Sequence, residues 1–511
     1  MSVPENALPT GGTAKPTQKS EKTYVIDRRD RFILGGTLIW CFLAVDTILW
    51  SWPWGLGLAA AGALWYVLTL VALGPGCLRR REDRLLLVMN LALFASFALT
   101  SNSWFRVWNF LAVLVLVPVH LISLSGAGRL PWQRPVMLWE RFCLLLVGLF
   151  GQLGAAGAAL TSASAPRRRT LTAVLGAAGA LALLAVLVPV LASADALFAA
   201  ATADVRTFVR AHFSTALWKL LWALILTPFA FSLLYFLRRP APLSQVRERP
   251  ERTVDGLAFA VMLAAVAALY ALFLAVQSAG LFGGESYLAA RGLSYAQWAR
   301  SGFFQMVGVT VVNLTVLLLS LTFSRRSGRC FTAVRLLGAV LTAESFLLLA
   351  SAAWRMTLYV EAYGLSFKRG MTYWGMGMMA LFFLAAAVKL LKPDFGFFRA
   401  AAPVALAGWL VINCVPMDYL VARDQVDRYL SGQSETIDVE YLLYSLSYDT
   451  LSQLDRLDGD LICRTWTDWG DCSGQARLST LLEDRRQEAR QDCADWRSWN
   501  LSACLAAMGG D

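Results

Sequence analysis

Long runs of apolar residues alternate with short polar loops along most of this 511-residue chain. Each run is roughly 17 to 25 residues long, which is enough for a helix to cross a hydrocarbon core of about 30 Å. The pattern therefore predicts an all-α polytopic integral membrane protein with about 11 transmembrane helices. The predicted spans are residues 32–52, 54–74, 85–102, 107–125, 171–193, 215–237, 254–276, 302–323, 335–353, 370–391 and 399–415.

One further apolar segment, residues 142–163, does not fit the alternation of the loops. Basic residues flank it on both sides, with Arg134 and Arg141 before it and residues 167–169 after it. A span here would place every later basic loop on the other side of the membrane. We therefore expect an interfacial or re-entrant segment, whose Gly and Ala residues allow close packing on neighbouring helices.

The basic loops set the predicted orientation. With the N-terminus in the cytoplasm, 28 Lys and Arg of residues 1–415 fall on the inner side and 8 on the outer side. Cytoplasmic loops of membrane proteins carry such an excess of positive charge. The prediction is a disordered cytoplasmic tail over residues 1–31, a transmembrane helical domain over residues 32–415, and an extracytoplasmic C-terminal domain over residues 416–511.

Composition agrees with this class of protein. The chain is 57% hydrophobic and 16% charged, with a mean hydropathy of +0.53, unlike a soluble globular protein. Its net charge of +11 divides into +20 for residues 1–415 and −9 for residues 416–511. Because membrane topology explains the positive part, we expect no nucleic-acid partner. The lipid bilayer is the partner that the composition requires.

The acidic C-terminal part predicts a small helical domain. Amphipathic patterns begin near Met417 and Ile437, and Asp438 is placed to cap the second helix. Four cysteines follow, and an even number in a small external domain suggests two disulfides with three possible pairings. A zinc site is the alternative, but this part has no histidine and no paired C-x-x-C spacing. The disulfide candidates are Cys463, Cys472, Cys493 and Cys504.

Polar side chains inside the predicted spans indicate a first candidate site. Glu344 lies deep in a span, where a carboxylate is costly unless it is paired, protonated or facing water. Gln305 and Asn313 lie eight residues apart on one face of the preceding helix, so the three residues predict an intramembrane polar seam. Glu344 could bind a proton or a cation there. Alternatively, it joins two helices through a hydrogen bond to Asn313 or to a Ser or Thr.

A second candidate site lies at the outer rim of the helices, where charged and aromatic residues gather in the loops. Such a cluster could bind an anionic headgroup or an acidic ligand. The alternative is that it docks the C-terminal domain, whose net charge is negative. The rim cluster consists of Asp195, Arg300, Arg355, Tyr359, Glu361, Tyr363 and Arg369.

The sequence contains none of the common catalytic or cofactor-binding patterns. It has no P-loop, dinucleotide fingerprint, H-E-x-x-H pair or G-x-S-x-G elbow. The only two histidines are His120, in a span near the cytoplasm, and His212, in an outer loop, so they do not share a metal site. We therefore expect no cofactor, no metal and no catalytic residue of a known class.

Several stretches of the chain resemble a known family. They are SADALF from Ser193, YAQWARSGFFQMVGVTVVNL from Tyr295, RMTLYVEAYGLSFKR from Arg355, and the later strings VDRYLSGQSETIDVEYLLYSLSYDTL and DWRSWNLS. Together, over roughly residues 85–500, they resemble a family of bacterial multi-pass membrane proteins described as domain of unknown function 4173, or its relative 4153. The resemblance implies a bacterial cytoplasmic membrane and this architecture, and it implies no activity.

Three hypotheses for the function follow. The first is a non-catalytic scaffold, sensor or regulator whose external domain binds a protein partner or a small ligand. The second is a secondary transporter or ion pathway that uses Glu344. The third is a membrane-embedded enzyme that acts on lipid-linked substrates at the outer rim. The soluble external domain and the missing catalytic motifs favour the first, while the ligand and the oligomeric state stay open.

Overall fold

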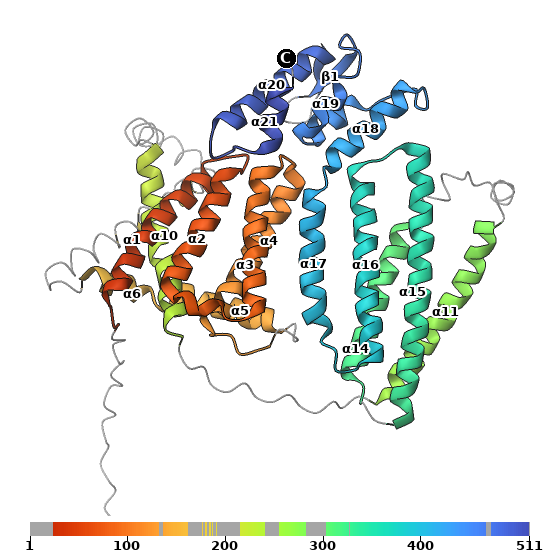
Figure 1. Cartoon of the computed structure of the whole chain (residues 1–511), viewed down its shortest axis with the longest axis horizontal. Coiled ribbons are helices and arrows are strands. Elements are labelled where there is room, and N and C mark those ends of the chain that lie inside the picture. Colours follow the sequence, from red (N-terminus) through yellow and green to blue (C-terminus); the bar gives the residue numbers. More distant parts are fainter. Residues whose placement is uncertain are drawn as a thin grey trace, which may run out of the picture.

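The computed structural model describes residues 24–131, 136–161, 215–240, 255–282, 303–325, 328–466 and 472–509, with isolated positions between residues 176 and 191. This part of the chain is almost entirely helical (Figure 1). Nine of its helices are long and apolar enough to cross a membrane. The chain is therefore a helical multi-pass membrane protein.

The first group of helices packs around one hydrophobic core. Its buried members include Ile33, Trp65, Leu93, Leu121 and Leu234, one from each helix. The helices are α1 (Arg28–Ala44), which continues as the π-helical segment η1 (Val45–Leu49), α2 (Leu56–Leu73), α3 (Arg81–Leu99), α4 (Ser103–Ser125) and α10 (Thr215–Arg238), with a 3₁₀ turn η2 (Pro75–Leu78) between α2 and α3. α1 begins at Arg28, inside the segment predicted to be a disordered tail.

The second group consists of α11 (Gly256–Phe282), α14 (Phe303–Phe323), α15 (Gly328–Tyr363) and α16 (Phe367–Leu391). A separate core that includes Leu263, Leu317, Leu341 and Ala386 holds these helices together. α17 (Phe397–Cys414) stands between the two groups and contacts both α16 and α3 (Figure 1).

The apolar segment that disturbed the predicted topology forms α5 (Met137–Gly151) and α6 (Leu153–Thr161). At its start, Arg141 Nη1 donates to Ser123 Oγ in the last turn of α4, at 2.8 Å. Further on, the Gln152 amide donates to Ser232 Oγ near the end of α10, and Gly154 lies against Tyr24, just before α1. The segment therefore runs along one end of the bundle (Figure 1), as an interfacial or re-entrant segment would, although its length and composition would also allow a span.

The last part of the chain, residues 417–509, covers the other end of the helices, and we call it the cap (Figure 1). Its core includes Val421, Leu442, Leu454 and Leu478, and it continues into the helix ends through Phe105, Phe367 and Ile412. Its elements are α18 (Met417–Leu430), η3 (Tyr441–Ser445), η4 (Tyr448–Thr450), α19 (Leu451–Leu454), β1 (Ile462–Trp466), β2 (Cys472–Arg477), α20 (Leu478–Ala494) and α21 (Leu501–Met508). β1 and β2 form an antiparallel hairpin, which the sequence pattern did not predict.

The second predicted helix of the cap is broken into η3, η4 and α19. Asp438 does cap its start, since Oδ1 accepts from the Tyr441 amide at 2.9 Å. The break follows Leu446, where the Ser447 amide donates to the buried Asp418 carboxylate of α18 at 3.0 Å. A tertiary hydrogen bond to a buried carboxylate thus competes with helix propagation at this point.

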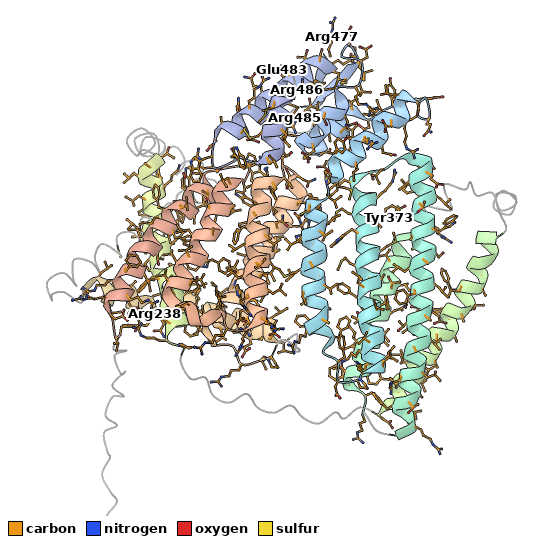
Figure 2. The ribbon with its side chains drawn as sticks, in the orientation of Figure 1. Arg238, Tyr373, Arg477, Glu483, Arg485 and Arg486 are labelled. Atoms are coloured by element: carbon orange, nitrogen blue, oxygen red, sulfur yellow. A yellow bond between two sulfur atoms is a disulfide. The ribbon has the colours of Figure 1, made fainter. Side chains whose placement is uncertain are left out.

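Ion pairs close the end of the bundle that lies away from the cap. Arg238 and Arg239, at the end of α10, both pair with Asp27 and with Asp30, which is 1% exposed (Figure 2). Asp27 and Asp30 also form the capping box of α1. Because both carboxylates cap the start of α1 and also pair with the arginines, they join the start of α1 to the end of α10.

Ten of the eleven predicted spans coincide with helices, and the span 171–193 lies largely outside the described residues. The nine helices of sufficient length and hydropathy are a different set. They include the α5–α6 segment and leave out α3, which carries charges from Arg81 to Arg84, and α14, which counts only from Val307. The number of spans therefore stays a prediction.

The cap is seated on α2 through backbone groups. The amides of Gly55 and Gly57 donate to the Arg497 carbonyl at 3.1 and 3.2 Å, and the Leu56 amide donates to the Trp499 carbonyl at 2.9 Å. The first amides of a helix have no partner within the helix. Residues 497–499 of the cap therefore complete the N-terminus of α2.

Replacing Gly55 tests this seat. A Cβ at this position would lie 2.4 Å from the Ser498 carbonyl carbon and oxygen, so Gly55→Ala has to push the backbones apart. We expect Gly55→Ala to destabilise the docked cap by about 1–3 kcal/mol, the usual cost of overpacking. Thermal unfolding in detergent and limited proteolysis of the cap measure the effect.

Gly35→Ala in α1 is the matched control, since a Cβ there meets nothing within 4 Å. Alanine is favoured over glycine by roughly 0.5–1 kcal/mol inside a helix, so this variant should be at least as stable as the wild type. Equal stability and equal protease resistance of Gly55→Ala and Gly35→Ala would contradict the proposed seat.

Candidate functional site

The loop between α3 and α4 connects the helices to the cap. Asn102 Oδ1 accepts from the Phe105 amide and so caps α4, while its Nδ2 donates to Asp418 Oδ2 of the cap at 2.7 Å. Ser101 Oγ lies 2.7 Å from Ser502 Oγ, which in turn donates to Asp449. Ser101, Asn102, Asp418 and Ser502 are buried, so these hydrogen bonds between the cap and the helices lie in an environment of low dielectric constant, where they are stronger than in water.

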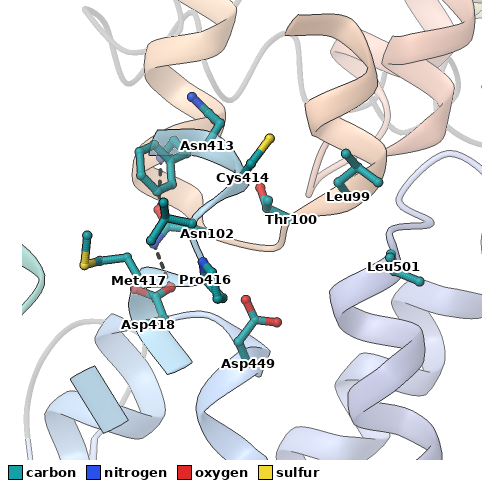
Figure 3. Close-up of a pocket in the computed structure, with 12 residues that line it drawn as sticks. Leu99, Thr100, Asn102, Asn413, Cys414, Pro416, Met417, Asp418, Asp449 and Leu501 are labelled. Carbon is teal, nitrogen blue, oxygen red and sulfur yellow. Dashed lines mark hydrogen bonds between the residues drawn. The ribbon is translucent and has the colours of Figure 1, made fainter. Parts of the chain in front are cut away.

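A first cavity of about 280 Å³ lies beside this loop. Asn102 and Asn413 reach it from the helix ends, and Asp418 and Asp449 reach it from the cap (Figure 3). Asp418 is 2% exposed and accepts hydrogen bonds from Asn102 and from the Ser447 amide, both of them neutral donors. Burial raises the pKa of the Asp418 carboxyl above its ordinary value of 3.8.

A second cavity, of about 410 Å³, is also shared between the two parts. Both the helix ends and the cap contribute residues to its walls, and the cap contributes more of them. The helix side contributes Trp52, Pro53, Ser101, Ser103 and Arg106, and the cap contributes residues 444–448 with Arg485, Glu488, Gln491 and Asp492. We call this space the junction cavity.

Arg106 is the helix-side charge of the junction cavity. It lies in the first turn of α4, and it is 2% exposed. Its Nε and Nη2 atoms are buried and have no hydrogen-bond partner among the described residues. A buried charge without a partner costs several kcal/mol, so a structure tolerates one where a ligand or ordered water completes it.

The cap side of the cavity carries a hydrogen-bonded carboxylate. The Tyr448 hydroxyl donates to Asp492 Oδ2 at 3.0 Å. Burial raises the pKa of the Asp492 carboxyl, and burial together with Asp492 raises the pKa of the Tyr448 hydroxyl. Arg485 is already engaged: its guanidinium lies 4.8 Å from the Tyr448 ring centroid, and Nη1 donates to Glu488 at 2.5 Å.

A charge network at the rim joins the cap to α1 and α10. Asp46 lies in η1, the π-helical turn in which the first helix ends. Lys219 of α10 pairs with Asp46 at 2.5 Å, and Arg497 of the cap pairs with it at 3.3 Å. Arg497 also pairs with Asp495, which lowers the pKa of the Asp495 carboxyl.

The structure resolves part of the predicted polar seam. Asn313 Nδ2 donates to Ser345 Oγ at 3.0 Å, and the Tyr270 hydroxyl donates to Asn313 Oδ1 at 2.7 Å. Glu344 is 8% exposed, and its Oε2 has no hydrogen-bond partner within the described part of the chain. The side chain of Gln305 lies outside that part. Asn313 therefore joins three helices without using Glu344.

The predicted rim cluster is only partly brought together. Arg369 lies 4.2 Å from the Tyr359 ring centroid, and its guanidinium donates to the backbone carbonyls of Tyr363 and Gly364. Arg355 is buried in α15 at 6% exposure.

Other members of the predicted cluster stand apart from this group. Glu361 is exposed, and Asp195 and Arg300 lie outside the described residues. The group that the structure assembles around Arg369 is therefore smaller than the predicted cluster.

The cap docks on this rim through backbone groups. Asp424 Oδ2 accepts from the Leu365 amide at 2.5 Å, and Gln425 donates to the Leu365 carbonyl at 2.7 Å. Arg428 donates to the carbonyls of Val360 and Glu361 at 3.1 and 2.9 Å. These contacts favour the docking alternative for this surface, although the contacting groups differ from the charge pairs that the sequence suggested.

One of the two expected disulfides is present. Cys493 and Cys504 are bonded and close a loop between α20 and α21. Cys463 is a free, buried thiol, so its assignment to a disulfide is corrected. In the β1–β2 register Cys463 faces Ala476, while Cys472 faces Trp466. Cys463 and Cys472 are therefore displaced along the hairpin by four residues, roughly 13 Å at 3.3 Å per residue, which is too far for a disulfide.

No group of three or more His, Cys, Asp or Glu within the described ranges is arranged to hold a metal ion. His120 is buried, and its Nδ1 lies 3.0 Å from the Tyr66 hydroxyl. His120 therefore links α4 to α2 inside the first helix group.

Sequence reasoning missed the residues that line the junction cavity. Arg106 stands in the stretch SNSWFRVW, and an arginine four residues after a capping asparagine at the start of a span is a usable signal. Asp492 and Tyr448 carry no such signal, because only the folding of the cap brings them to the cavity.

The fold and this junction define a class: a multi-pass membrane protein whose C-terminal cap is docked on one end of its helices. A family model described as a domain of unknown function, DUF4153, matches residues 87–457. The chain belongs to this family. No curated protein and no solved structure matches it.

Neutralising Asp418 tests how burial of this carboxylate affects the docked cap. A carboxylic acid with a raised pKa binds more protons in the docked state, so docking weakens as pH rises from about 4 through that raised value. Asp418→Asn removes the charge and keeps an acceptor for Asn102 or Ser447. We expect a higher melting temperature than wild type at pH 8 and a smaller change in melting temperature between pH 5 and pH 8. Each pKa unit by which burial shifts Asp418 corresponds to about 1.4 kcal/mol of stability that the substitution recovers at high pH.

Asp460→Asn serves as the control, because the Asp460 side chain is 77% exposed. Its melting temperature should follow that of the wild type at each pH. If Asp418→Asn and wild type keep a constant difference from pH 5 to pH 8, the ionisation of Asp418 does not control docking.

Proposed function

We infer that this protein is a non-catalytic sensor or regulator of the bacterial cytoplasmic membrane. Its cap binds a ligand or partner on the extracytoplasmic side, and the state of the cap is passed to the helices. The observation that supports this function is the junction cavity, because its walls belong both to the cap and to the helix ends. A ligand in such a place has different contacts when the cap is docked and when it is displaced.

The seat of the cap supports a relay to both helix groups. On the first group, it completes the start of α2 and pairs with Asp46. On the second group, α18 binds the turn between α15 and α16. Because α17 leads directly into α18, a displaced cap would release contacts on both groups at once.

The distribution of charge supports the orientation. Arg238, Arg239 and the basic residues at the starts of α3 and α15 lie at the end of the bundle opposite the cap (Figures 1 and 2). With that end in the cytoplasm, the positive-inside rule is obeyed and the cap is extracytoplasmic. The Cys493–Cys504 disulfide suits that oxidising side.

A transporter or ion pathway is the second candidate, and Glu344 is the observation that favours it. Its buried Oε2 has no partner in the described part of the chain, as a proton or cation site inside a membrane would require. The enzyme hypothesis gains no comparable support, because Arg369 binds backbone carbonyls and Tyr359 at the rim.

A covalent lock of the cap tests the sensor function. The Oγ atoms of Ser101 and Ser502 are 2.7 Å apart, so cysteines at both positions can form a disulfide across the junction. In a strain that lacks the gene, transcript and envelope profiles should be restored by the wild type and by Ser101→Cys alone. They should stay defective with Ser101→Cys/Ser502→Cys, because the locked cap cannot move.

Full restoration by the locked protein, with the cross-link verified by gel shift, would reject a moving cap. Glu344→Gln, tested in the same strain, separates the second candidate. The sensor hypothesis expects it to restore the profiles, whereas a transport pathway through Glu344 expects it to fail.

A further inference from the structure

Arg106 lines the junction cavity, and one edge of its guanidinium lacks a hydrogen-bond partner among the described residues. Nε and Nη2 of Arg106 are the two unpartnered atoms, and they lie on the same side of the planar group. This edge presents two parallel N–H donors, which match the two oxygens of a carboxylate or of a phosphate. Arg106 is 98% buried beside the cavity, so the surrounding protein fixes the position of this edge.

The other charges of the cavity narrow the chemistry of the ligand. Arg485 is paired with Glu488 and stacked on Tyr448, so these two charges offset each other, while its Nε has no hydrogen-bond partner within the described residues. Arg106 and Asp492 then line the same cavity without an ion pair between them. The positive charge of Arg106 favours the ionised form of Asp492 and opposes the effect of burial on its pKa. A simple anion would pair with Arg106, but it would be repelled by the Asp492 carboxylate.

A ligand that carries both a negative and a positive charge can pair with Arg106 and with Asp492 at the same time. A carboxylate on the Arg106 edge would place an adjoining ammonium toward the Asp492 carboxylate, which the Tyr448 hydroxyl orients. The cavity of about 410 Å³ is at the small end of the usual range for ligand sites, which suits an amino acid or a dipeptide. Its wall also includes the aromatic residues Trp52, Tyr444 and Tyr448, against which an apolar side chain can pack.

We propose that the junction cavity binds a small amino carboxylate, an amino acid or a short peptide, with its carboxylate on Arg106 and its ammonium on Asp492. The proposal rests on the sensor function and names the ligand of the same site. Because the two charged groups belong to α4 and to the cap, the bound ligand bridges them and holds the cap docked.

The test uses the full-length protein in nanodiscs of zwitterionic lipid and measures binding by calorimetry and by thermal shift. The panel consists of the twenty amino acids, dialanine and diglycine. Three further probes isolate the charges: propionate has the carboxylate alone, propylamine has the ammonium alone, and inorganic phosphate is a different anion.

We expect saturable binding of at least one amino carboxylate, and binding of its deaminated or decarboxylated analogue to be at least about tenfold weaker. Arg106→Lys keeps the charge but loses the two-donor edge, and it should weaken binding of the amino carboxylate by about tenfold or more. Asp492→Asn keeps a hydrogen-bond partner for Tyr448. It should weaken binding of the amino carboxylate and leave binding of propionate unchanged or make it stronger. Arg477→Gln, at an exposed position of the cap, should bind as the wild type does (Figure 2).

Three outcomes would overturn the proposal. They are no binding by any member of the panel, binding of phosphate or propionate as tight as that of the amino carboxylates, and binding that Asp492→Asn does not alter. Protease resistance of the cap identifies variants that have failed to fold. Binding with these properties in a protein whose Ser101–Ser502 lock still restores the strain would support the site and reject the sensor function.

Discussion

The start of α2 is the contact on which the position of the cap depends. Three amides, from Gly55 to Gly57, have no partner inside the helix, and the carbonyls of Arg497 and Trp499 supply it. The approach is so close that only glycine fits at residue 55. The Cys493–Cys504 disulfide closes the loop that provides these carbonyls. The same loop carries Arg497 to Asp46 and follows directly from Asp492 of α20, so one seat sets both the rim network and the cap wall of the junction cavity.

Hydrophobic periodicity was enough to predict the helices, because apolar length is a local property of the chain. Nine predicted spans match helices within a few residues, and the tenth, residues 335–353, lies inside the longer helix α15. Whether residues 142–163 form an interfacial segment or a span stays a prediction. The cap was less predictable. Its second helix breaks where Ser447 meets Asp418, a residue 29 positions earlier, and its hairpin register separates Cys463 from Cys472.

The candidate sites were harder still to predict, because they depend on contacts between residues far apart in the sequence. The sequence marks a charge inside a span, as at Glu344, but it does not show what the charge meets. Asn313, the expected partner, is taken by Ser345 and Tyr270. Arg106 was overlooked because it stands at a span end among aromatic residues, where an arginine usually reaches water. The cap covers that end, and the resulting burial turns an ordinary interfacial arginine into the central charge of a cavity.

This covering also indicates how the proposed ligand would act on so large an assembly. A ligand that touches only the cap would bind the docked and displaced states equally and shift nothing. A ligand held between Arg106 of α4 and Asp492 of α20 loses one of its two charged contacts when the cap leaves, so its binding free energy adds to the docked state. At a concentration of about 100 times the dissociation constant, that addition is at most about 2.7 kcal/mol, the value for a ligand that does not bind the displaced state. This is comparable with the cost expected for disturbing the Gly55 seat, so occupancy of the cavity and the fit of α2 would control the same equilibrium.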